Sequence, residues 1–168
     1  QILFFYRVTD IFPALALGLG EGDEHIMKEP PRDPKETLLS RRRWLGIAGY
    51  GAVITLSVLG ALLYAIHGLG YGNEQAVSVS FLTLAFSQLF HVFNMRDKGS
   101  AFANNEITRN PYVWGALGLC SFLIAAAVYI KPLAEVLRII PPGIEGWTLI
   151  AVMSLAPLAI GQILKIFR

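Results

Sequence analysis

Residues 44–67 read WLGIAGYGAVITLSVLGALLYAIH and contain no charged side chain. About 20 apolar residues, each rising 1.5 Å along a helix, are enough to cross the hydrocarbon core of a bilayer. Similar charge-free stretches cover residues 75–95, 111–130 and 146–164, and the apolar stretch 1–20 is interrupted only by Arg7 and Asp10. The sequence therefore predicts an all-α, polytopic membrane helix bundle.

Composition agrees with this class. Hydrophobic residues make up 54% of the 168 residues and charged residues only 15%, whereas soluble domains carry about 25% charged residues. We expect a single membrane domain with about five transmembrane helices. They lie near residues 1–20, 44–67, 76–95, 111–130 and 147–164.

Basic residues divide unequally between the connecting segments. The predicted loops 21–43 and 96–110, together with the carboxyl-terminal tail, hold eleven Lys and Arg residues, and the opposite loops hold only Lys131 and Arg138. Because short loops rich in Lys and Arg stay cytoplasmic, we predict a cytoplasmic carboxyl terminus and an outer amino terminus. A chain that starts outside needs an earlier transmembrane segment or a signal peptide, so we expect this sequence to be part of a longer protein or a trimmed subunit.

Ionisable side chains inside a span are costly and are functional candidates by default. Asp10 follows Tyr6 by four residues and Arg7 by three, so these side chains share one helix face. Pro13 has no N–H to bond the carbonyl of Thr9, four residues earlier. A carbonyl, a hydroxyl and a carboxylate so close together suit a hard cation. Alternatively, Arg7 pairs with Asp10 and neutralises it without any ligand.

A polar stripe runs along the third predicted span and is expected to face the bundle. Its members are Ser80, Thr83, Ser87, His91 and Asn94, with Gln88 adjoining. These groups either bond neighbouring helices or supply ligand oxygens. Glycines such as those at positions 46, 49, 51, 115 and 118 either allow close helix contacts or reflect how common glycine is in membrane helices.

Several motifs together resemble one family. The run VTDIFPALALG, residues 8–18, resembles the sixth membrane helix of P-type cation-transporting ATPases of the calcium-pump branch, and IMKEPPRDP, residues 26–34, resembles the loop after it. SQLFHVFN, residues 87–94, is similar to the eighth helix. NPY, residues 110–112, resembles the start of the ninth, and GQILK, residues 161–165, the end of the tenth. The resemblance covers essentially the whole chain in order.

The resemblance implies a cation pathway in which Thr9 and Asp10 are ligand positions. Gln88 falls where two-site calcium pumps have a glutamate, so it is a third candidate ligand. Tyr6 stands where the family usually has an asparagine ligand, and Arg7 stands where it has an apolar residue. A phenol is a poorer ligand than an amide carbonyl, and a permanent guanidinium beside Asp10 competes with a bound cation.

The resemblance does not extend to catalysis within this chain. The phosphorylated aspartate of the family, in an Asp-Lys-Thr-Gly-Thr motif, does not occur in the sequence. The chain is therefore not catalytic by itself, and whether it belongs to an enzyme depends on its other parts. One interpretation is the carboxyl-terminal membrane domain of a P-type ATPase, contributing part of a cation pathway. The other is a stand-alone accessory or structural subunit of a larger membrane complex, derived from such a pump and no longer transporting.

Both interpretations imply the same surroundings. The expected partners are the lipid bilayer and either the remaining pump domains or other subunits, and nucleic acid is not expected. No cofactor is expected in this chain apart from a transported cation, calcium or another hard cation. The location we expect is the plasma membrane, as a multi-pass protein.

Overall fold

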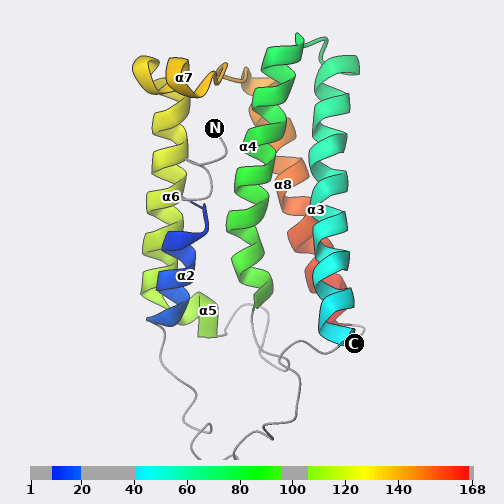
Figure 1. Ribbon diagram of the computed structural model, residues 1–168, viewed down its shortest axis with the longest axis vertical. Coiled ribbons are helices and arrows are strands. Elements are labelled where there is room, and N and C mark those ends of the chain that lie inside the picture. Colours follow the sequence, from blue (N-terminus) through cyan, green and yellow to red (C-terminus); the bar gives the residue numbers. More distant parts are fainter. Residues whose placement is uncertain (1–8, 20–40, 96–105, 167–168) are drawn as a thin grey trace, which may run out of the picture.

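The computed structural model describes residues 9–19, 41–95 and 106–166, and within these ranges the chain forms helices and no strand. Tyr6 and Arg7 lie outside them. The elements are α2 (Ile11–Gly18), α3 (Arg41–His67), α4 (Asn73–His91), the 3₁₀ helix η2 (Val92–Met95), α5 (Glu106–Arg109), α6 (Pro111–Tyr129), α7 (Lys131–Leu137) and α8 (Ile144–Ile166) (Figure 1).

Four helices of the described ranges are long and apolar enough to cross a membrane. These are Trp44–His67, Asn73–Met95, Pro111–Tyr129 and Ile144–Ile163. They confirm the predicted class, an all-α membrane helix bundle. The structure describes the predicted span 1–20 only from Thr9 to Leu19, so this fifth span stays a prediction.

Helices extend beyond the apolar stretches at several points. α3 begins at Arg41 rather than at Trp44, and α4 begins at Asn73. Backbone hydrogen bonding does not require apolar side chains, so a helix continues past the hydrocarbon core when nothing in the sequence stops it. The short helices α5 and α7 lie in segments that the sequence marks only as loops.

Five of the helices fall into two groups (Figure 1). α3, α4 and α8 pack against one another, and α2 packs against α6. Half of the apolar window of α4 is buried, against 6% of that of α3. α4 is therefore the central helix, and α3 presents most of its apolar surface to the outside of the bundle. Small residues on facing sides, such as Ala61, Ala65 and Ala76, are fully buried and allow α3 and α4 to approach closely.

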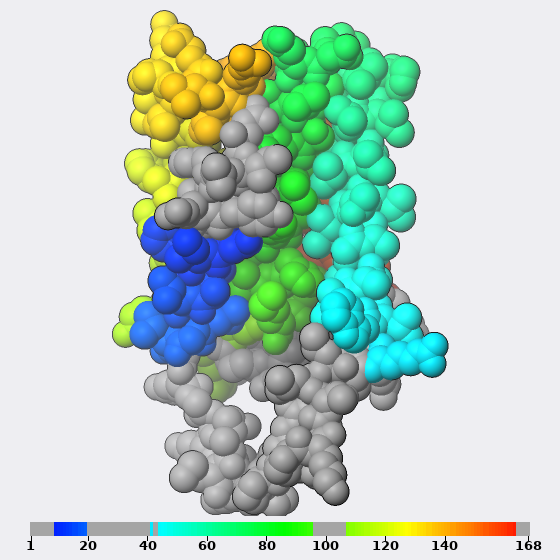
Figure 2. All heavy atoms as spheres, viewed as in Figure 1, coloured from blue at the N-terminus to red at the C-terminus, as the bar shows by residue number. Residues whose placement is uncertain are grey.

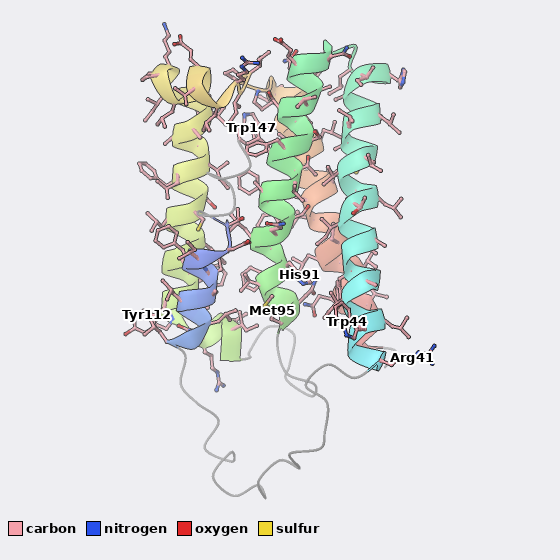
Figure 3. The ribbon with its side chains drawn as sticks, viewed as in Figure 1. Arg41, Trp44, His91, Met95, Tyr112 and Trp147 are labelled. Atoms are coloured by element: carbon pink, nitrogen blue, oxygen red, sulfur yellow. The ribbon has the colours of Figure 1, made fainter. Side chains whose placement is uncertain are left out.

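The helix ends gather at two opposite faces of the bundle. Arg41, Trp44, Met95 and Tyr112 lie toward one end, and Trp147 lies nearer the other (Figure 3). α2 ends, α3 begins, α6 begins and α8 ends at the same face. This alternation agrees with the predicted order of loops, and the two long predicted loops fall mostly outside the described residues.

Candidate functional site

The candidate site begins at a break in the helical backbone. Asp10 is the N-cap of α2, yet its side chain makes no capping hydrogen bond. Its carbonyl accepts from the Ala14 amide at 3.2 Å. Pro13 stands in the first turn of α2 and has no N–H with which to bond the Thr9 carbonyl. The helix is thus interrupted at Thr9 and Asp10, the two positions that the sequence marks as ligand candidates.

The side chain of Gln88, on α4, contacts Thr9 at this break. The Thr9 hydroxyl lies 3.1 Å from Gln88 Oε1 and 3.4 Å from Asp10 Oδ1. Thr9 is 4% exposed, whereas Asp10 is exposed. Figure 2 shows the blue atoms of α2 next to the green atoms of α4. Thr9 and Gln88, which are 79 positions apart in sequence, therefore contribute to one oxygen cluster.

In this cluster, one hydroxyl proton lies within reach of two acceptor oxygens. The Thr9 hydroxyl has one proton, and two neighbouring oxygens, from Gln88 and Asp10, compete for it. Calcium takes oxygen ligands at about 2.4 Å, so two oxygens that share one ion lie roughly 3 Å apart. The separation of Thr9 Oγ1 and Gln88 Oε1 has this size. The three oxygens, one of them from a carboxylate, are of the type that a hard cation binds.

Of the three side chains at the site, only that of Asp10 carries a charge. Within residues 9–19, 41–95 and 106–166, no group of three or more His, Cys, Asp or Glu side chains could hold a metal ion. Calcium needs six to eight oxygens, so three oxygens fill about half of a shell. A complete shell needs further oxygens, from backbone carbonyls, water or other side chains. Tyr6 and Arg7, the two departures from the family pattern, are among the residues outside them.

Two hydroxyls of the polar stripe, those of Thr83 and Ser80, bond within α4. Thr83 donates to the Val79 carbonyl at 2.8 Å, and Ser80 donates to the Val77 carbonyl at 2.9 Å. Both bonds are within α4, so these hydroxyls neither join helices nor reach Thr9. Ser87 is 1% exposed, and its hydroxyl has no hydrogen-bond partner among the residues that the structure describes. Of the stripe, Gln88 is the member whose side chain the structure brings to Thr9 and Asp10.

A second polar cluster joins α3, α4 and α8 near the end of α4. Gln162 Nε2 donates to Asn94 Oδ1 at 2.8 Å and to the Phe93 carbonyl at 3.1 Å. The Tyr50 hydroxyl donates to the Gly161 carbonyl at 3.3 Å, and the Tyr50 ring contacts His91 edge-on with centroids 5.0 Å apart. The sequence marked Asn94 and His91 as polar residues facing the bundle, and their partners on α3 and α8 appear only in the tertiary structure.

Sequence reasoning missed one residue beside the site. Asn110 was noted only within a family motif, but its side chain caps α6 and also bonds α2. The signal was available, since Asn followed by Pro is a strong combination at the start of a helix. That signal predicts the cap of α6, and nothing in it predicts the contact with α2.

Comparison with known proteins places the chain in a family. A family model described as "Cation transporting ATPase, C-terminus" matches residues 1–167. The chain belongs to this family. It is 31% identical over 157 residues to a calcium-transporting ATPase of Bacillus subtilis (strain 168), covering 94% of this chain and 18% of that protein. The resemblance inferred from the sequence motifs is confirmed.

Two further relatives agree. The calcium-transporting ATPase 1 of Bacillus cereus (strain ATCC 10987 / NRS 248) is 28% identical, covering 100% of this chain and 20% of the relative. A calcium-transporting ATPase of Listeria monocytogenes serovar 1/2a is also 28% identical, covering 100% of this chain and 19% of the relative. The chain spans about a fifth of the length of these curated relatives. It is a cation-transporting ATPase C-terminus, a multi-pass membrane domain.

Proposed function

We propose that this cation-transporting ATPase C-terminus works as part of an ATP-driven calcium pump of the plasma membrane, together with nucleotide-binding and other pump domains. Thr9, Asp10 and Gln88 supply oxygen ligands to the transported ion. The observation that carries the proposal is the approach of the Thr9 hydroxyl to Gln88 Oε1 and Asp10 Oδ1, at 3.1 and 3.4 Å. The three relatives, all calcium-transporting ATPases, support calcium as the ion.

The physical argument rests on the cost of such groups in a membrane. A carboxylate at a helix break, beside a buried hydroxyl and an amide oxygen, costs insertion free energy and is retained where it has a partner. A cation satisfies all three oxygens at once, whereas the single hydroxyl proton satisfies one. Broken helices near the bilayer midplane are a general way to build such ion sites.

Arg7 bears on the affinity of the site. It precedes Asp10 by three residues in sequence, and at 4 Å a like charge opposes a bound cation by about 4 kcal/mol per unit charge at an effective dielectric constant of 20. We infer that the site releases calcium more readily than a site with an apolar residue there. Replacing Arg7 by leucine is expected to lower the calcium concentration that gives half-maximal ATP hydrolysis.

The test uses the native protein that contains this chain, in membranes or purified in detergent. Asp10→Asn preserves size and removes the charge, so calcium-dependent ATP hydrolysis should need roughly a hundred- to a thousandfold more calcium. Gln88→Leu removes one neutral ligand and should have a smaller effect in the same direction. Ser87→Ala, at the neighbouring buried position, is the matched control and should leave the calcium response unchanged.

An Asp10→Asn protein with the calcium response of wild type would show that Asp10 is not a ligand. A native protein with no calcium-dependent ATP hydrolysis would refute the proposed pump and favour an accessory subunit.

A further inference from the structure

Asn110 uses both ends of its side-chain amide, each on a different helix. Its Oδ1 accepts from the Tyr112 amide at 2.9 Å, which caps α6. Its Nδ2 donates to the Ala16 carbonyl at 2.9 Å, in the last turn of α2. The residue is only 8% exposed. One buried amide thus joins the start of α6 to the end of α2.

Each bond pairs a backbone group near a helix end, the Tyr112 amide at the start of α6 and the Ala16 carbonyl at the end of α2. The first amides of a helix and its last carbonyls lack partners within that helix. Asn110 has the extended backbone of an N-cap, with φ −78° and ψ 109°, and Pro111 follows it as the first helical residue. Asn is among the best N-caps, because its side-chain oxygen reaches the amide two residues on. The capping hydrogen bond therefore holds the Asn110 side chain in one orientation, independently of its contact with α2.

The tether acts on the helix that carries the candidate ligands. Ala16 follows Asp10 by six residues, which corresponds to about 9 Å along a helix axis. α2 has eight residues and packs mainly on α6. A helix this short moves as a unit, so a shift or rotation at Ala16 is passed to Asp10. Functional geometry tolerates errors of about 0.5 Å.

We propose that Asn110 is a positioning residue for the cation site. It holds α2 on α6 at the height and rotation that bring Thr9 and Asp10 to Gln88. This inference rests on the proposed function, because it concerns the affinity of the site formed by these three residues. Asn110 itself touches none of them and does not bind the ion.

Two substitutions separate the cap from the tether. Asn110→Asp keeps an oxygen that accepts from the Tyr112 amide but has no N–H to donate to the Ala16 carbonyl. Asn110→Ser also caps a helix well, and its shorter side chain does not reach α2. Asn110→Ala removes both interactions. Asn73→Asp, an exposed position at the start of α4, makes the same chemical change away from the site.

The measurement is calcium-dependent ATP hydrolysis by the purified native protein, together with its thermal unfolding midpoint. For Asn110→Asp and Asn110→Ser we expect the half-maximal calcium concentration to rise roughly two- to tenfold. This factor corresponds to the free energy that one hydrogen bond contributes. The maximal rate at saturating calcium should stay unchanged. Asn110→Ala should show the same shift and also a lower unfolding midpoint. Asn73→Asp should match wild type in both measurements.

Wild-type calcium dependence in both Asn110→Asp and Asn110→Ser would show that Asn110 only caps α6, and the inference would be wrong. Asp10→Asn, measured in the same series, identifies which idea has failed. If Asp10→Asn shifts the calcium response and the Asn110 variants do not, the positioning role alone is refuted. If Asp10→Asn also has no effect, the proposed cation site is refuted as well.

Discussion

Gly161 lies at a close contact between α8 and the neighbouring side chains of Tyr50 and Asn94. A Cβ added there would lie 2.5 Å from Asn94 Nδ2, 2.8 Å from Asn94 Cγ and 2.6 Å from Tyr50 Cε1. These side chains cannot easily move aside. Asn94 is bonded to Gln162 and to the Pro157 carbonyl, and Tyr50 donates to the carbonyl of Gly161 itself. A single methyl group would therefore force α8 away from α3 and α4.

We predict that Gly161→Ala destabilises the protein by about 1–3 kcal/mol, the usual cost of overpacking a tight contact. In an open helical position the same change would stabilise the helix by up to about 1 kcal/mol, so the contact reverses the sign of the effect. For a domain of this size, a loss of 1–3 kcal/mol lowers the unfolding midpoint by roughly 2–12 °C. The change would be seen as an earlier loss of the monodisperse peak on heating in detergent.

Gly118→Ala in α6 is the matched control. A Cβ at Gly118 meets nothing within 4 Å in the described part of the chain, so its unfolding midpoint should stay the same or rise. An unchanged or raised midpoint for Gly161→Ala would refute the reasoning, because it would mean that Tyr50 and Asn94 make room without loss.

Two other contacts give predictions of the same kind. The Ser78 hydroxyl accepts from the Ile140 amide at 3.0 Å. Ser78→Ala should leave that amide unpaired, lower the free energy of unfolding by about 1–3 kcal/mol and speed hydrogen exchange at Ile140. Unchanged exchange at Ile140 would argue against the bond. Trp147 Nε1 donates to the Tyr129 hydroxyl at 2.9 Å, so Tyr129→Phe should cost about 0.5–1.5 kcal/mol of unfolding free energy, and an unfolding midpoint equal to wild type would show that the bond contributes nothing.

The ligand candidates illustrate how far local sequence carries the site. Thr9 and Asp10 are neighbours in sequence, and Pro13 removes the amide that would continue the helix there, so the helix break is predictable from sequence order. Gln88 is 79 residues from Thr9, and no local rule brings them together. A family resemblance marks both as ligand positions, and the 3.1 Å separation comes from the tertiary structure, which places Thr9, just before α2, against Gln88 of α4.

The sequence pattern does not show which glycines lie at contacts between helices. The sequence offered close helix contacts at glycines 46, 49, 51, 115 and 118 as one interpretation, yet a Cβ at any of these meets nothing within 4 Å in the described residues. Gly161 does lie in a close contact between helices, and the sequence analysis named it only as part of the family motif GQILK. Whether a glycine lies in a contact depends on which side of its helix faces a neighbour, and that is decided by the arrangement of the helices.

The sequence by itself determined the class of this protein, its apolar helices and the helix break at Asp10. These features follow from local chemistry, because charge-free stretches of 20 residues and a proline act on their own segment. Only the tertiary structure decided which residues of different helices lie in contact. Gln88 bonds Thr9, Asn110 donates to the Ala16 carbonyl, and Tyr50 and Asn94 pack against Gly161. Helices in a membrane associate through shape and a few hydrogen bonds, so their contacts depend on the fit of whole surfaces.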